Sequence, residues 1–228
     1  MQAPNVKFVK DELFVESVRK AFIVIDLLND MERPLRLSEI AELAGIGKSA
    51  TQRFVHTLTV LGYLHQNTHT KTYSLSPRIL TYARGFLKSS QFHSCAKPIL
   101  QDLAELTGET VNLSEISGSE IVLTIRFPSI HTVSVNLDLG SRLPVFNTAP
   151  GRAIISNWTE TKAQQAIDGC DLQPWTPTTV TDPDKLRETL RSVRKAGYAF
   201  TNQEAFMGDL SIAAPIFSFD GDCSAAVN

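Results

Sequence analysis

The chain of 228 residues is long enough for two modest domains, and its hydrophobic content of 43% is typical of packed globular protein. No stretch approaches the ~18 apolar residues that a membrane span needs, and the three cysteines lack Cys-x-x-Cys spacing. We therefore expect a cytoplasmic protein without disulfides, metal or any other cofactor. The net charge of −2 does not indicate nucleic acid, although residues 1–75 carry nine Lys and Arg against eight Asp and Glu.

The first predicted element is an amphipathic helix over residues 12–29. Apolar side chains recur there at helical spacing, among them Phe14, Val18, Phe22 and Leu28. We expect this stripe to face the core of the first domain.

A helix, a turn and another helix follow. The second predicted helix begins at Ser38, whose hydroxyl can cap free backbone N–H groups, and ends at Gly45, which permits a tight reversal. The third helix spans residues 48–61 and has one apolar and one polar face. Residues 63–75 then alternate as an extended ribbon with a polar tip. This order predicts a winged helix-turn-helix domain in residues 8–76.

The polar face of the third helix is suited to the major groove of B-form DNA, which is ~12 Å wide. Arg53 can donate two parallel hydrogen bonds to guanine, and Gln52 can pair with adenine. The other candidates lie in the first turns of the helices, where phosphate is within reach, or on the wing. The predicted DNA-binding residues are Arg36, Ser38, Lys48, Ser49, Ala50, Thr51, Gln52, Arg53, His56 and Lys71. The same spacing also suits a helical hairpin in a larger fold, with its charges merely solvated.

A linker helix is predicted over residues 77–90, opened by Pro77, and a second domain over residues 91–228. This domain mixes helices and strands, so the fold class is α+β with a mostly antiparallel sheet. Its predicted strands are 110–116, 120–127, 133–137, 211–217 and 224–227, and its predicted helices are 92–107, 150–157, 160–168 and 183–196.

The run from Leu37 to Arg53, followed by Leu61-Gly62-Tyr63-Leu64, resembles the DNA-binding domain of the IclR family of bacterial regulators. The resemblance implies a GAF-like effector-binding domain, a homodimer that can pair into homotetramers, and palindromic operator DNA, with repression or activation as the output. The family often has Thr and His where this chain has Ala50 and Gln52. Relatives also continue beyond the position of Asn228, so we expect a truncated C-terminus. Further matching stretches are residues 73–80, 139–144, 149–153, 197–204 and 212–216.

The resemblance also implies that a small-molecule effector lies against the sheet of the second domain. The matching positions are Ala149, Pro150, Gly151, Thr201, Asp209, Leu210, Ser211 and Asn228. Because a helix N-terminus offers free N–H groups to an anion, the chain around Pro150 favours a carboxylic acid, aromatic ones included. We expect this acid to come from a catabolic pathway. Asp209 argues against a dicarboxylate, since two negative charges repel. Each position also has a plain structural interpretation as a turn, a cap or an alternating strand residue.

Two other classes of function stay open. An enzyme in the second domain is one, because Gly221-Asp222-Cys223-Ser224 looks superficially like a nucleophile motif. It falls in a predicted hairpin without a strand-to-helix elbow or a His partner, so we expect no enzymatic activity. The other is an adaptor whose winged helix binds protein. A steep fall of affinity with added salt would favour DNA.

Overall fold

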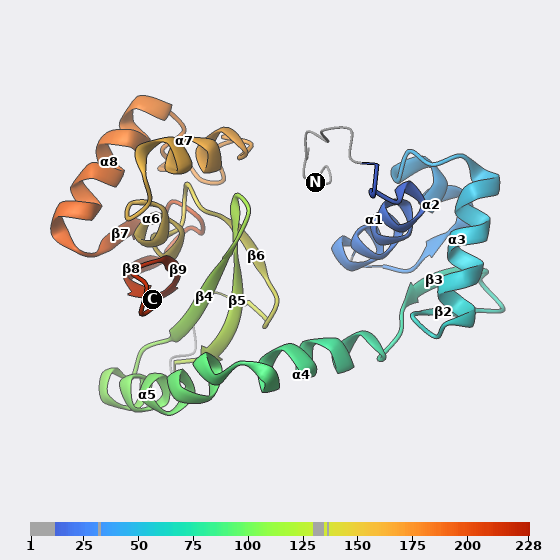
Figure 1. Ribbon diagram of the computed structural model, residues 1–228, viewed down its shortest axis with the longest axis horizontal. Helices are drawn as coiled ribbons and strands as arrows, with labels where there is room; N and C mark the ends of the chain where they lie inside the picture. The colour runs from blue at the N-terminus through green and yellow to red at the C-terminus, as the bar shows by residue number, and fades with distance from the viewer. Residues whose placement is uncertain (1–11, 32, 130–134, 136) are drawn as a thin grey trace. The chain divides into compact units, whose positions relative to one another are not determined.

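The computed structural model describes residues 12–31, 33–129, 135 and 137–228. The chain separates into two compact units, residues 1–89 and 90–228 (Figure 1). The elements of the first unit are α1 (Glu16–Asp30), β1 (Leu35–Arg36), α2 (Leu37–Leu43), α3 (Lys48–Val60), β2 (Leu64–Asn67), β3 (Thr72–Leu75) and α4 (Ile79–Ser89). The predicted winged helix-turn-helix is therefore confirmed, with a three-stranded sheet in the order β1-β3-β2.

The start of α2 differs from the prediction. Ser38 does not cap this helix, which begins one residue earlier, at Leu37. The carboxylate of Glu39 instead accepts a hydrogen bond from the backbone N–H of Arg36 at 2.8 Å. A Glu at the third helical position reaches back to the N-cap in this way, so it replaces the expected serine. Strand β1 was not predicted, because two residues are too few to show an alternating pattern.

Helix α1 carries two apolar rows, and only one of them is buried. Val24 and Leu28 lie in the core of the unit with residues of α2 and α3. Phe14, which precedes α1, and Val18 and Phe22 of α1 are 41%, 51% and 58% exposed, so the prediction that they face the core is wrong. The three-helix core has room for one row of α1, which leaves the second row on the surface.

The second unit contains α5 (Gln91–Thr107), β4 (Val111–Ser117), β5 (Glu120–Phe127), β6 (Arg142–Pro144), α6 (Ala149–Ile155), α7 (Glu160–Asp168), α8 (Pro183–Ala196), β7 (Ala199–Asn202), β8 (Leu210–Phe217) and β9 (Cys223–Val227). Their strands form one antiparallel sheet in the order β6-β5-β4-β9-β8-β7, and the α+β class is confirmed. Strands β6 and β7 were not predicted, because they have three and four residues. The predicted strand over residues 133–137 falls mostly outside the described residues.

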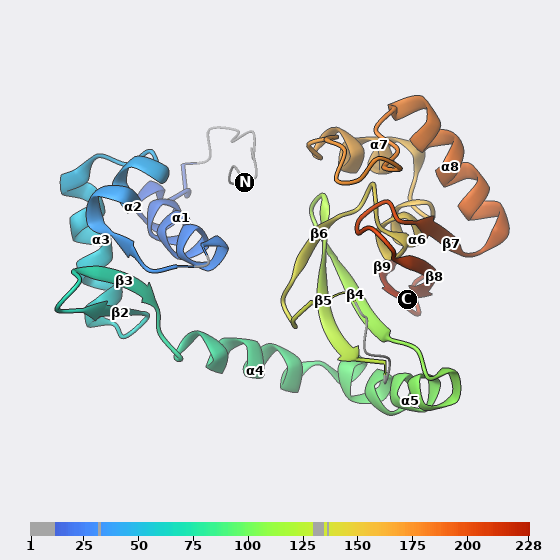
Figure 2. The same ribbon diagram turned by 180° about the vertical axis from the view of Figure 1, so that it is seen from behind.

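Helices cover both faces of this sheet, as the two opposite views show (Figures 1 and 2). Leu100 of α5 packs on one face with Leu113 and Ala225, whereas α6, α7 and α8 pack on the other with Ala213 and Ala226. Side chains alternate between the faces of a strand. The neighbours of Leu113 on β4, Asn112 and Ser114, therefore lie on the α6 face.

None of the helices in the described part of the chain combines the length and apolar character that crossing a bilayer requires. Among the same residues, no three His, Cys, Asp or Glu side chains are grouped so that they could hold a metal ion.

Candidate functional site

The exposed face of α3 is the first candidate site. It carries Lys48, Ser49, Gln52, Arg53 and His56, all of them exposed. The opposite face holds Thr51, Val55 and Leu58, which are buried at helical spacing. The structure thus brings together the predicted base readers and the polar residues beside them on one surface.

Two predicted DNA contacts of α3 do not belong to this surface. Thr51 is fully buried, and its hydroxyl lies within donating distance of the carbonyls of Ile46 and Gly47, at 3.1 and 3.2 Å. Its side chain cannot reach phosphate, which corrects the prediction. It instead ties the first turn of α3 to the preceding turn. Ala50 is half-buried and packs against the apolar core.

The predicted DNA contacts outside α3 are exposed residues of the same domain. Arg36 and Ser38 are exposed at the start of α2, and Lys71 is exposed at the tip of the wing. The Asn67 side chain accepts hydrogen bonds from the backbone N–H groups of His69 and Thr70, at 3.0 and 3.1 Å. This turn presents Lys71 in the left-handed conformation, with φ of 57°.

The linker helix α4 is joined to the wing by a cluster of Tyr63, Arg78 and Tyr82. The two tyrosine hydroxyls are hydrogen bonded, and the Arg78 guanidinium lies 5.1 Å from the centroid of the Tyr63 ring. Arg78 also donates to the carbonyl of Leu61 at 2.9 Å. No residue of α4 is buried, and these contacts near its start join it to the first unit.

A cavity of about 480 Å³ in the second unit is the second candidate site. It lies on the α6 face of the sheet and is bounded by β4, β5, the start of α6 and the β7–β8 hairpin. Seven of the eight predicted effector residues line it: Ala149, Pro150, Thr201, Asp209, Leu210, Ser211 and Asn228. Their role in binding stays a prediction.

Gly151 is the predicted effector residue that does not line this cavity. It is buried in α6 against the chain that leads into the helix. A Cβ atom at this position would lie 2.4 Å from the Cα atom of Val145. Glycine is therefore needed for close backbone approach, and a direct ligand contact is not supported.

Sequence reasoning missed several polar residues of the cavity, and three of them, Asn112, Ser114 and Arg126, lie on its floor. All three lie on strands that are otherwise strongly apolar. The alternation Val111-Asn112-Leu113-Ser114 carried a signal, because it places two polar side chains on one face of a buried strand.

A buried ion pair fixes the loop that bounds the cavity after β7. Arg152 of α6 is 2% exposed and donates to both carboxylate oxygens of Glu204, each at 2.6 Å. Its Nε donates to the carbonyl of Phe146 at 2.7 Å, and the backbone N–H of Val180 donates to Glu204 at 3.1 Å. Since Ala205, Phe206 and Asp209 follow in the lining, this pair holds one wall of the cavity in place.

Asp209 brings a negative charge to the lining at a cost to stability. Burial raises the pKa of its carboxyl above the usual range. The folded protein therefore binds this proton more tightly than the unfolded chain does. This destabilisation of the folded protein is absent at pH values below the ordinary carboxyl pKa. It grows as the pH rises toward the raised pKa of Asp209.

We accordingly expect Asp209→Asn to raise the free energy of unfolding at neutral pH, and the gain to vanish as the pH falls below the ordinary carboxyl pKa. Urea unfolding of both proteins across this range measures the difference. Asp138→Asn, at an exposed position, is the control. A gain that did not depend on pH would contradict the assignment to the buried charge.

The cysteine of the nucleophile-like motif is not available for catalysis. Cys223 is 4% exposed on β9, and burial raises the pKa of its thiol. A protonated, buried thiol is a poor nucleophile.

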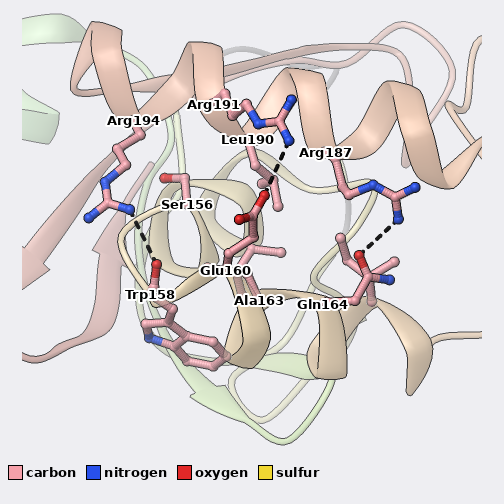
Figure 3. Close-up of a pocket in the computed structure, with 11 residues that line it drawn as sticks. Ser156, Trp158, Glu160, Ala163, Gln164, Arg187, Leu190, Arg191 and Arg194 are labelled. Atoms are coloured by element: carbon pink, nitrogen blue, oxygen red, sulfur yellow. Dashed lines mark hydrogen bonds and ion pairs between the residues drawn. The ribbon is translucent and has the colours of Figure 1, made fainter.

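A smaller cavity of about 210 Å³ lies between α7 and α8 (Figure 3). Its polar groups already have partners. Arg191 pairs with Glu160 at 3.1 Å, Arg187 donates to Gln164 at 2.9 Å, and Arg194 donates to the carbonyl of Trp158 at 3.4 Å. Two of these pairs join α8 to α7, and the third joins α8 to Trp158, just before α7.

Comparison with known proteins identifies both units. Residues 85–228 match the family described as "Bacterial transcriptional regulator IclR C-terminal", and residues 17–68 match the "IclR helix-turn-helix domain". The chain is 31% identical over 222 residues to the Pca regulon regulatory protein of Pseudomonas putida, which covers 97% of this chain and 76% of that protein.

Solved structures of IclR proteins have the same fold. An IclR transcriptional regulator from Alicyclobacillus acidocaldarius superposes with a TM-score of 0.82 at 25% identity, over 94% of this chain and 86% of that one. An IclR homologue from Microbacterium hydrocarbonoxydans, complexed with 4-hydroxybenzoate, has the same fold, with a TM-score of 0.76 at 23% identity over 92% and 87%. The chain therefore belongs to the IclR family of DNA-binding bacterial transcriptional regulators.

Proposed function

We propose that this regulator senses a small carboxylic acid from a catabolic pathway, and that the acid binds in the 480 Å³ cavity of the second unit and changes the affinity for operator DNA. The observation that carries the proposal is that lining residues from β4, β5, α6 and the β7–β8 hairpin converge on one concave space. Its volume falls in the range of about 300–1,000 Å³ that is typical of small-molecule sites. The 4-hydroxybenzoate bound by the Microbacterium homologue supports an aromatic acid as the first candidate.

The lining combines apolar walls with polar groups, as ligand sites do. Leu123, Leu143 and Phe206 offer apolar surface, and Thr148 and Thr201 offer hydroxyls. Such a mixture suits a ligand with an apolar body and a few polar substituents.

Operator recognition is proposed to use α3 for the bases and the wing for phosphate. A homodimer on a palindromic operator would place two copies of α3 one DNA turn apart. The exposed apolar rows of α1 and α4, including Val18, Phe22 and Leu80, support assembly, because contiguous exposed apolar surface marks interaction sites. The same surfaces are also compatible with the pairing of two dimers into a homotetramer.

Arg53→Ala and Lys71→Ala are expected to differ in a diagnostic way. Arg53→Ala should weaken specific binding by about 1–3 kcal/mol and leave nonspecific binding nearly unchanged, because it removes contacts to a base. Lys71→Ala should weaken both about equally, since phosphate contacts carry no sequence information. Fluorescence anisotropy with operator and scrambled DNA measures the two affinities.

Lys71→Ala also serves as the control for charge, because both substitutions remove one cation from exposed positions of the same domain. Equal losses on the two DNAs for both variants would remove Arg53 as a base reader.

Calorimetric titration of the full chain tests the sensor half of the proposal. The panel is benzoate, 4-hydroxybenzoate and 3,4-dihydroxybenzoate, each paired with its neutral amide. Saturable binding of at least one acid supports the proposal. If no acid binds and a neutral compound does, the assigned ligand class is wrong.

A further inference from the structure

A row of polar side chains crosses five strands of the sheet on the floor of the cavity. It consists of Arg126 on β5, Asn112 on β4, Asn228 after β9, Ser211 on β8 and Thr201 on β7, and we call it the polar row. Asn112 is directly opposite Arg126 in the ladder, and Thr201 is directly opposite Ser211. Opposed residues share a face of the sheet, so the row lies on one surface.

Hydrogen bonds join the members of the row. The backbones of Asn112 and Asn228 exchange two hydrogen bonds, at 2.8 and 3.0 Å, and the Asn228 amide donates to the Ser211 hydroxyl at 3.2 Å. At the other end Arg126 donates to Asn112 Oδ1 at 3.0 Å and to the carbonyl of Val135 at 2.6 Å. These two bonds fix the plane of the guanidinium.

Arg126 sets the electrostatics of the cavity. Among the described lining residues it is the only cation, whereas Glu109 and Asp209 contribute carboxylates. A guanidinium has five N–H groups in a planar fork, and the two bonds above use two of them. The remaining donors match the geometry of a carboxylate, which arginine binds through two parallel hydrogen bonds.

The start of α6 offers a weaker seat for an anion. Ala149 and Pro150 are buried, Pro150 has no N–H group, and the Thr148 hydroxyl donates to the carbonyl of Pro144 at 2.8 Å. Helix α6 has only seven residues, so its dipole is small. A fixed guanidinium carries a full charge and outweighs this partial one.

Asp209 and Arg126 lie at different strands of the cavity floor. Asp209 directly precedes β8, and β8 lies three strands from β5 in the sheet. At about 4.8 Å per strand, Arg126 and Asp209 are roughly 14 Å apart along the sheet. A carboxylate at Arg126 therefore avoids Asp209, whereas a second carboxylate on the same ligand would approach it.

We infer that Arg126 is the residue that binds the carboxylate of the effector, and that the ligand body extends from it along the polar row toward Ser211. The inference rests on the proposed effector function and makes it specific. The site then selects monocarboxylates, and Arg126 discriminates an acid from its neutral amide.

Arg126→Gln in the full-length protein tests this, with calorimetric titration of each acid and amide that the wild type distinguishes. We expect the affinity for the acid to fall roughly 10- to 100-fold, and the affinity for the amide to stay the same. Arg142→Gln, an exposed arginine on neighbouring β6, should change neither. Arg126→Lys keeps the charge without the fork and should retain part of the preference for the acid.

Retention of the wild-type acid preference by Arg126→Gln would overturn the inference and leave the effector function standing. A parallel loss of acid and amide binding in both Arg126 variants would also overturn it, because the residue would then shape the cavity without reading charge. Failure of every acid to bind the wild type would instead contradict the effector proposal itself.

Discussion

Arg152→Met is expected to lower the free energy of unfolding of the second unit by about 3–5 kcal/mol. The substitution keeps an unbranched side chain in α6 but leaves the carboxylate of Glu204 buried without its partner. It also frees the carbonyl of Phe146. Both tryptophans, Trp158 and Trp175, belong to this unit, so urea unfolding followed by tryptophan fluorescence reports on it directly.

The matched control is Arg142→Met, which breaks an ion pair with Glu120 at a partly exposed position. Exposed pairs contribute about 0–1 kcal/mol, so this variant should unfold almost like the wild type. The double variant Arg152→Met with Glu204→Met removes both charges and should recover part of the loss, since an apolar pair carries no unpaired charge. Equal effects at Arg142 and Arg152 would contradict the role given to burial.

Gly151→Ala is expected to lower the free energy of unfolding by about 3 kcal/mol, at the upper end of the cost of overpacking. The new Cβ would lie 2.4 Å from Val145 Cα and 2.5 Å from the Val145 carbonyl oxygen. Both are backbone atoms, so α6 must move away from the preceding chain. Because Ala149 and Pro150 line the cavity, ligand affinity should fall as well, and calorimetry measures this second effect.

Gly85→Ala is the control for the substitution itself. Gly85 lies in α4, and a Cβ there meets no atom within 4 Å. Alanine is favoured over glycine in a helix by about 0.5–1 kcal/mol, so this variant should be neutral or more stable. A Gly151→Ala protein as stable as the wild type would contradict the prediction, because the segment around Val145 would then move to make room for the Cβ atom.

The sequence predicted most of the helices because they are long and their ends carry clear signals. Gly108 and Gly197 follow α5 and α8 in the left-handed conformation that glycine favours, as expected of helix ends. The sequence did not predict the short strands, because these form only by pairing with neighbouring strands. Strands β1, β6 and β7 become visible only through their partners, and the periodicity of two to four residues cannot reveal them.

The sites were predicted unevenly for a related reason. Helical spacing placed Gln52 and Arg53 on one face, because that depends on a single helix. Helical spacing could not predict that Thr51 turns inward, because its hydroxyl is hydrogen bonded to carbonyls of the preceding turn. Arg126 was missed because its place in the cavity depends on the register of β4 against β5 and on the order of strands in the sheet.

The apolar row of α1 illustrates the limit of periodicity. Phe14, Val18 and Phe22 have the spacing of a core stripe, yet they lie on the surface of the chain by itself. An amphipathic pattern indicates that a face is covered. It does not say whether the cover comes from the same chain or from another copy.

We propose that this protein couples the binding of an acid in its second unit to the binding of DNA by its first. The most direct measurement is the affinity of the full-length protein for its own upstream DNA, by fluorescence anisotropy, without and with a saturating acid from the panel. We expect the affinity for operator DNA to change at least several-fold with the acid and to stay constant with its amide. An operator affinity that is the same at saturating acid would contradict it, since a ligand without preference between the states of the protein cannot regulate it.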